Sequence, residues 1–248
     1  RSISNLAFLG KCIEVAVDVQ LRAYCEKYDL FGSHQHGFRK SRSTTTALLT
    51  AVTRWRSNKV KKKFQGALLF DLSAAYDLLD KDLFLQKAKL YGIDGMALKW
   101  LDSYLTGRKQ VVQVGNARST PRNINYGTPQ GSSCSCLIFA LFVGDVGQWV
   151  DEGLIQAFAD DTFITLEADT MEDLKEKMKQ EGEKVVKYFY SNLMVVNPSK
   201  TEILIFRPTT HHNQTTEEIS LGGKLIKVND KAKLLGIWIT SNLKWCTH

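Results

Sequence analysis

Two adjacent carboxylates interrupt an apolar stretch in the second half of the chain. Asp160 and Asp161 stand in LIQAFADDTFITLE, residues 154–167, between two segments that resemble the arms of a β-hairpin. A third carboxylate, Asp71, directly follows the short apolar run at residues 67–70, which is typical of a buried strand. An Asp-Asp pair at a hairpin tip also has a purely structural interpretation, because Asp is a common turn residue.

The spacing of these acids suggests metal-dependent chemistry, because two strand-end acids from separate segments can meet at the edge of one sheet. Converging carboxylates repel each other unless a cation neutralises them, and Mg²⁺ prefers oxygen ligands of this kind. Two such ions, about 3.5–4 Å apart, can activate an attacking hydroxyl and stabilise a leaving pyrophosphate. The acids therefore predict a phosphoryl-transfer site of the kind that polymerases use.

The elements that would position these acids follow from hydrophobic periodicity and turn signals. The first helix, residues 6–28, has Leu9, Ile13, Ala16, Val17 and Leu21 as its expected apolar stripe. Further helices are expected after Ser43, in residues 82–91 with Gly92 as the stop, in 99–106 before Gly107, in the apolar segment after residue 131, and after Thr170, with Asp173 in the partner position of a capping box. Short strands are expected at residues 109–115, 202–206 and 233–240, and TTHHNQTTEE, residues 209–218, resembles a linker. This order predicts an α+β fold with a mostly antiparallel sheet packed on helices.

The composition favours a polyanionic partner. Lys and Arg total 33 against 26 Asp and Glu, which gives a net charge of +7 and a pI near 9.1. The excess is clustered, although each cluster can also be an ordinary solvated face. The clustered residues are Arg39, Lys40 and Arg42; Arg54, Arg56, Lys59, Lys61, Lys62 and Lys63; and Arg108 with Lys109. No apolar run is long enough to span a membrane, so a membrane partner is not expected.

Six motifs in order resemble the reverse transcriptases of non-LTR (LINE-type) retrotransposons. They are QHGFRKSRST, FDLSAAYDLLD, YGTPQGSS, FADD, NPSKTEILIF and KLLGIWI. The resemblance covers nearly the whole chain, and SYLTGRKQVVQV between the motifs is similar to the family as well. It implies an RNA-directed DNA polymerase that extends a DNA primer with dNTPs on an RNA template and serves retrotransposition.

The resemblance implies a metal site and a general acid. Asp71 and Asp160 would bind two Mg²⁺ ions, with Asp161 as the third family carboxylate, the backbone carbonyl of Leu72 as a further ligand and Mn²⁺ as a substitute metal. Lys200 in NPSKTE resembles the lysine proposed in polymerases to protonate pyrophosphate. A solvated surface lysine is the other interpretation of this residue.

The resemblance also implies nucleotide- and primer-binding sets. Tyr76 matches the aromatic residue that crowds the 2′ position and favours dNTPs over rNTPs, although core packing would also explain it. Guanidinium groups suit phosphates because they stay charged and bind bidentately, and Gly permits close backbone approach. The nucleotide-binding residues would be Arg1, Arg39, Arg42, Leu72, Tyr76, Pro129, Gln130 and Gly131. The primer-binding residues would be Leu234, Leu235 and Gly236, for which core packing is again the alternative.

The same resemblance predicts a domain organisation. Residues 1–248 would form one reverse transcriptase domain of the right-hand type, with 1–66 and 93–126 mainly fingers, 67–92 and 127–248 mainly palm, and no thumb or endonuclease. Two other functions stay open: an RNA-binding fragment without catalysis, and an RNA-dependent RNA polymerase, against which Tyr76 argues. An intracellular location, nuclear or cytoplasmic, is expected, and only the family suggests the nucleus.

Overall fold

The computed structural model describes residue 4, residues 6–208 and residues 217–243, in two compact units. Unit 1 comprises Arg1–Leu30 and Ala74–Val143, and unit 2 comprises Phe31–Ser73 and Gly144–His248. Arg1 and residues 209–216 of the expected linker lie outside the described residues. Among the described residues, no helix has the length and hydropathy needed to cross a membrane.

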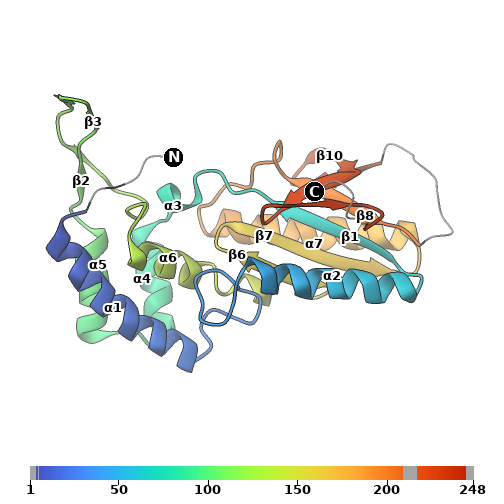
Figure 1. Ribbon diagram of the computed structural model, residues 1–248, viewed down its shortest axis with the longest axis horizontal. Helices are drawn as coiled ribbons and strands as arrows, with labels where there is room; N and C mark the ends of the chain where they lie inside the picture. Colours follow the sequence, from blue (N-terminus) through green and yellow to red (C-terminus); the bar gives the residue numbers. More distant parts are fainter. Residues whose placement is uncertain (1–3, 5, 209–216, 244–248) are drawn as a thin grey trace. The chain divides into compact units, whose positions relative to one another are not determined.

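Unit 2 is built on a mixed sheet. Within the described residues this sheet has six strands in the order β6-β7-β1-β8-β10-β9, and every pair is antiparallel except β8 with β10 (Figure 1). The strands are β1 (Phe64–Phe70), β6 (Leu154–Phe158), β7 (Asp161–Ala168), β8 (Glu202–Phe206), β9 (Glu218–Leu221) and β10 (Lys224–Asn229). The predicted α+β class with a mostly antiparallel sheet is therefore confirmed.

Two helices, α2 (Thr44–Val60) and α7 (Met171–Ser191), cover the two faces of β1 (Figure 1). Ala67 belongs to the same buried cluster as Trp55 of α2, whereas Gly66 lies against Met178 of α7. Because neighbouring residues of a strand point to opposite faces, the strand is buried on both sides, as its continuous apolar run predicted. The Trp55 indole donates a 3.1 Å hydrogen bond to Thr165 Oγ1, which satisfies its buried N–H.

Helix starts follow the capping signals of the sequence. Ser43 and Thr46 form a capping box at the start of α2. Thr170 accepts a hydrogen bond from the backbone N–H of Asp173 at the start of α7, so this cap is confirmed. Such a bond satisfies an N–H that has no partner within the helix. The hairpin of β11 (Lys231–Leu234) and β12 (Ile237–Thr240) and the short 3₁₀ helix η1 (Val146–Trp149) complete the regular elements of this unit within the described residues.

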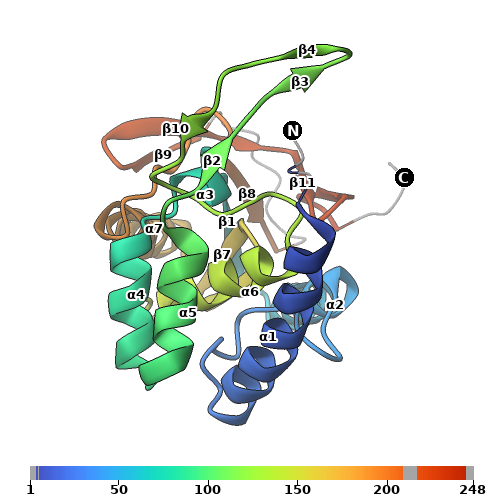
Figure 2. The same cartoon turned by 90° about the vertical axis from the view of Figure 1, so that its left-hand side faces the viewer.

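Unit 1 is mainly helical. Its helices are α1 (Phe8–Lys27), α3 (Ala75–Leu78), α4 (Lys81–Leu90), α5 (Gly95–Leu105) and α6 (Ser133–Phe142). Helix α1 packs on α6, and α4 packs on α5 and α6 (Figure 2). The expected strand at 109–115 is instead two short strands, β2 (Lys109–Gln110) and β3 (Gln113–Val114), which pair with β5 (Arg122–Asn123) and β4 (Ala117–Arg118). All residues of β2 and β3 are exposed, so the alternating apolar residues of this segment do not form the buried face that would favour one longer strand.

The apolar stripe expected on the first helix is wrong in part. Leu9 and Ile13 are 74% and 55% exposed, while Glu14, Leu21 and Cys25 form the buried positions of α1. Glu14 can be buried because its carboxylate accepts a 2.7 Å hydrogen bond from Ser132 Oγ. The periodicity predicted the helix correctly. It did not predict the buried face, because the hydrogen bond from Ser132 allows Glu14 to lie on that face.

Candidate active site

The two adjacent carboxylates lie at the tip of a tight hairpin. Strands β6 and β7 pair in register up to Phe158 opposite Asp161, which leaves Ala159 and Asp160 as a two-residue turn. Ala159 has φ 59°, and a positive φ at the first turn position suits the tight turns that join twisted antiparallel strands. The predicted Asp-Asp hairpin is confirmed.

Asp71 meets the hairpin at the end of β1. Phe70 pairs with Thr162 in the last pair of the two strands, and Asp71 and Asp161 are the next residues, so continuation of this register would place them opposite each other. Opposed side chains share a face of the sheet, with Cβ atoms about 4.5–5.5 Å apart. Asp71 and Asp161 line one small cavity of about 130 Å³, whereas Asp160 is half-buried in the turn and is not among the described residues that line it.

The predicted metal ligand Leu72 lies in an isolated backbone bridge with Val196. The bridge between Leu72 and Val196 uses two backbone bonds, from Asn197 N to Asp71 O at 2.8 Å and from Ser73 N to Val195 O at 3.0 Å. Neither bond involves the carbonyl of Leu72. Successive carbonyls of an extended segment point to opposite sides, so this carbonyl is expected on the side away from the segment 195–197.

Lys200 reaches Asp71 through a turn anchored on the same strand. Asn197 bonds the Asp71 carbonyl, and its own carbonyl accepts a 3.2 Å hydrogen bond from Lys200 N. The Lys200 ammonium lies 3.9 Å from Asp71 Oδ2, with 67% and 39% of the two side chains exposed. A pair this exposed contributes little to stability, so both groups remain available to a ligand.

The β11–β12 hairpin forms another wall of the cavity. Leu234 is buried in the core cluster with Trp55, Leu235 is half-buried against that cluster, and Gly236 is exposed at the turn. Lys233 lines the cavity as well. Sequence reasoning did not select Lys233, although its position directly before Leu234 could have indicated it.

The two arginines of the QHGFRKSRST motif, Arg39 and Arg42, donate hydrogen bonds to backbone carbonyls of the preceding loop. Arg39 donates a 2.6 Å hydrogen bond to the Gly32 carbonyl, and Arg42 donates a 2.6 Å bond to the Ser33 carbonyl. Arg39 also donates a 3.4 Å bond to the Gln35 carbonyl. The other proposed phosphate ligand, Arg1, lies outside the described residues.

Tyr76 and the loop of Pro129, Gln130 and Gly131, which were predicted to bind nucleotide, come together within unit 1. The Tyr76 ring stacks on Phe139 with centroids 4.5 Å apart, and its backbone carbonyl accepts a 2.9 Å hydrogen bond from Thr128 N. Gln130 Nε2 donates a 2.8 Å bond to Asp77 Oδ1. The loop that contains Pro129, Gln130 and Gly131 therefore packs on the start of the helix that carries Tyr76.

The donor set at the hairpin fits a hydrated Mg²⁺. Among the described residues, no group of three or more His, Cys, Asp or Glu side chains is arranged to hold a metal ion. Mg²⁺ does not need such a cage, because it usually keeps several waters and binds one or two carboxylates together with substrate phosphates. Asp71 and Asp161, which line one cavity, match that requirement.

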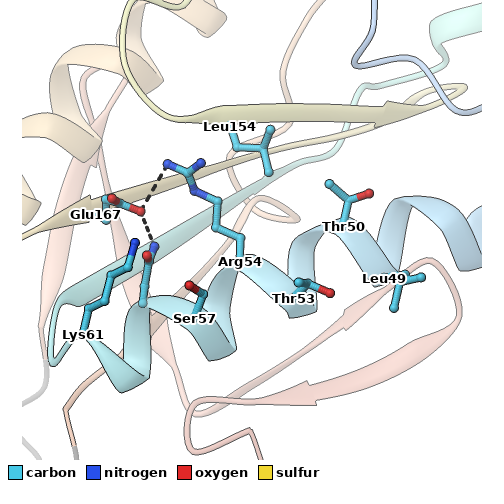
Figure 3. A pocket seen from close by; sticks show the side chains of 9 residues that line it. Leu49, Thr50, Thr53, Arg54, Ser57, Lys61, Leu154 and Glu167 are labelled. Atoms are coloured by element: carbon cyan, nitrogen blue, oxygen red, sulfur yellow. Dashed lines mark hydrogen bonds and ion pairs between the residues drawn. The ribbon is translucent and has the colours of Figure 1, made fainter.

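A larger groove in unit 2, about 600 Å³, lies along α2 and away from the three acids (Figure 3). There Arg54 forms an ion pair with Glu167 at 3.2 Å, and Asn58 also donates to Glu167. Thr50, Thr53, Ser57 and Lys61 line the same groove. Part of the basic cluster on this helix is therefore neutralised by β7.

A comparison with protein families identifies the chain. Residues 1–239 match the family model described as "Reverse transcriptase (RNA-dependent DNA polymerase)". The chain belongs to the reverse transcriptase family. The match spans nearly the full chain and includes all three acids.

This reverse transcriptase domain is related to polymerases of non-LTR retrotransposons. It is 26% identical to the probable RNA-directed DNA polymerase from transposon BS and 24% identical to that from transposon X-element, both of Drosophila melanogaster. It is 25% identical to the RNA-directed DNA polymerase from mobile element jockey of Drosophila funebris. Each match covers all of this domain but only 28%, 27% and 27% of the relative.

Solved structures support the fold of the reverse transcriptase domain. Apo telomerase from Candida tropicalis matches with a TM-score of 0.62 at 12% identity, over 94% of this chain and 40% of that one. Telomerase from Candida albicans, in complex with a fragment of telomeric RNA, matches with a TM-score of 0.60 at 13% identity, over 94% and 38%. At such low identity the likeness concerns the fold alone.

Proposed function

We propose that this chain is the core of an RNA-directed DNA polymerase that extends a DNA primer with dNTPs on an RNA template and serves retrotransposition. The observation that carries the proposal is that Asp71 and Asp161, the residues next to the last pair of β1 and β7, line one small cavity, with Asp160 in the adjoining turn. Membership of the reverse transcriptase family and the names of the Drosophila relatives support it.

The three acids and the Leu72 carbonyl would hold two Mg²⁺ ions, for which Mn²⁺ can substitute. When bound, such ions lower the pKa of an attacking hydroxyl and neutralise charge on the phosphates. The chain itself supplies oxygen ligands on one face of the sheet and an exposed Lys200 ammonium beside Asp71. In the proposed reaction, Lys200 gives a proton to the leaving pyrophosphate oxygen.

Other residues would bind and select the nucleotide. Arg39 and Arg42 are proposed to contact phosphates, because a guanidinium group stays charged and binds phosphate oxygens bidentately. Tyr76 is proposed to select dNTPs by crowding the 2′ position, and its stacking on Phe139 would keep the ring in one orientation. The loop that contains Pro129, Gln130 and Gly131 would lie beside the nascent base pair, and Leu234, Leu235 and Gly236 would contact the primer end. Arg1 would be a further phosphate ligand.

The division into fingers and palm is part of this proposal. Residues 1–66 and 93–126 would be mainly fingers, and residues 67–92 and 127–248 mainly palm. The two compact units divide the chain at other points, after Leu30, Ser73 and Val143. Because the chain spans little more than a quarter of its relatives, the template RNA and the way synthesis is primed depend on the whole protein.

Primer extension on an RNA template tests the function. The assay compares dNTPs with rNTPs, in Mg²⁺ or Mn²⁺, for the wild type, Asp160→Asn and Asp169→Asn. Asp169 is a matched control because it follows the far end of β7, is 82% exposed and lies 3.5 Å from Lys63. We expect metal-dependent extension with dNTPs that is lost only in Asp160→Asn.

Other results would favour the alternatives. Preferential use of rNTPs would indicate an RNA-dependent RNA polymerase. RNA binding without extension by any of the three proteins would favour a non-catalytic fragment. Equal extension by Asp160→Asn and the wild type would contradict the proposed metal site.

A further inference from the structure

The Ala159–Asp160 turn, which is followed by Asp161, lies next to the segment 34–37 of the same unit. His36 N donates a 2.7 Å hydrogen bond to the Ala157 carbonyl, and Ala157 N donates a 2.9 Å bond to the His34 carbonyl. These two bonds form a parallel bridge between Gln35 and Ala157 at the outer edge of β6. The segment 34–37 therefore follows β6 towards the turn that carries the acids.

Gln35 binds the turn directly through its side chain. The residue is fully buried, and its Oε1 accepts hydrogen bonds from Gly37 N at 2.8 Å and Ala159 N at 3.2 Å. Both partners are N–H donors, so the atom between them must be the amide oxygen. Ala159 is the first residue of the turn and directly precedes Asp160. The side-chain oxygen of Gln35 thus holds the peptide group between Phe158 and Ala159, which directly precedes the two acids.

Gly37 lets the two backbones come this close. A Cβ at position 37 would lie 2.4 Å from Ala159 N and 3.2 Å from Phe158 C, in contact with backbone that cannot move aside as a flexible side chain can. The backbone at Gly37 therefore lies directly against the backbone of the turn. Ala159 is 6% exposed, so without Gln35 its buried N–H would lack this partner.

From these contacts we infer that Gln35 is a positioning residue, which holds the Ala159–Asp160 turn, and with it Asp160 and Asp161, against the mutual repulsion of the acids so that they bind metal in one geometry. The catalytic consequence of this inference rests on the proposed polymerase function, whereas the positioning itself does not. Among the described residues the Gln35 Nε2 has no hydrogen-bond partner, so the oxygen provides the observed side-chain bonds.

Three substitutions separate positioning from general destabilisation. Gln35→Met keeps the length of the side chain and removes the acceptor, and Gln35→Glu restores an oxygen acceptor. Gln65→Met is the matched control, because Gln65 is equally buried, donates a 2.9 Å bond to the Trp55 carbonyl and lies at the opposite end of β1 from Asp71. Urea unfolding of all three variants gives the loss of stability to which the other readouts are compared.

Hydrogen exchange of the Ala159 amide, measured by NMR, tests the positioning without any assay of activity. Removing the only acceptor described for this N–H should make exchange at least about tenfold faster in Gln35→Met, and Gln35→Glu should recover protection. Stabilisation by added Mg²⁺ should weaken in Gln35→Met and persist in Gln65→Met. Unchanged Ala159 protection in Gln35→Met, or an equal change in Gln65→Met, would overturn the inference.

Primer extension then tests the catalytic consequence. Misplacement of reacting groups by about 1 Å can cost about 100-fold in rate, so we expect kcat of Gln35→Met to fall by about 10–100-fold with little change in KM for the primer–template. Gln35→Glu should recover part of kcat. Faster Ala159 exchange with unchanged kcat would refute a catalytic role. If the wild type does not extend primers, the proposed function fails, and the exchange and Mg²⁺ measurements still decide whether Gln35 positions the turn.

Discussion

The opposition of Asp71 and Asp161 has a consequence for stability that can be measured without substrate. Two unit charges about 5 Å apart repel by roughly 1 kcal/mol in water-like surroundings and by roughly 3 kcal/mol at an effective dielectric constant of 20. Asp161 is exposed, Asp71 is 39% exposed and Lys200 lies beside it, so the lower value applies. Asp161→Asn should therefore raise the free energy of unfolding of the metal-free protein by about 0.5–1 kcal/mol.

Added Mg²⁺ should reverse this order. A ligand that binds only the folded state stabilises it by about 1.4 kcal/mol at ten times its Kd. The wild type should gain this stabilisation, and Asp161→Asn should lose most of it because one of the two opposed carboxylates becomes a weaker neutral ligand. The stabilities of the two proteins, plotted against Mg²⁺ concentration, should therefore cross.

Urea unfolding, followed by tryptophan fluorescence across a MgCl₂ titration at constant ionic strength, measures this effect. Asp169→Asn serves as the control, since it removes an exposed carboxylate next to the opposite end of β7 and should leave the Mg²⁺ response intact. An Mg²⁺ response of Asp161→Asn equal to that of the wild type would refute the assignment of Asp161 as a ligand. A metal-free Asp161→Asn protein less stable than the wild type would refute the calculated repulsion.

Two further predictions concern the stability of the protein outside the candidate site. Burial, with a smaller effect of Arg39, lowers the pKa of His34 from 6.5 to about 4, so the stability provided by its neutral form is lost as pH falls from 6.5 towards 4. In urea unfolding, the difference in free energy of unfolding between wild type and His34→Gln should fall by about 2 kcal/mol from pH 7 to pH 5. A difference that stays constant with pH would contradict this. Gly10→Ala adds a Cβ in α1 that has nothing within 4 Å, so it should raise the free energy of unfolding by about 0.5–1 kcal/mol. Gly66→Ala adds a Cβ that would meet Met178, so it should lower the free energy of unfolding by about 1–3 kcal/mol. Thermal unfolding measures both variants, and equal effects would contradict the packing described.

The sequence by itself determined the local elements and the family. The caps at Ser43 and Thr170, the strand that ends before Asp71 and the hairpin around Asp160 each depend on hydrogen bonds or periodicity within a few residues. The order of the motifs identified the relationship that the family comparison confirmed. Local patterns of this kind can be read from sequence because the interacting groups are near one another along the chain.

Only the tertiary structure decided which groups meet. The pairing of β1 with β7 ends at Phe70 and Thr162 and brings Asp71 and Asp161, rather than Asp160, to one cavity, and a one-residue slip would have turned the side chains of one strand to the other face. Residues more than 100 positions apart in sequence, such as Gln35 and Ala159, are joined by a single side-chain bond that no periodicity predicts. Register and burial depend on the packing of the whole unit, because many weak contacts from distant segments act together to select one arrangement.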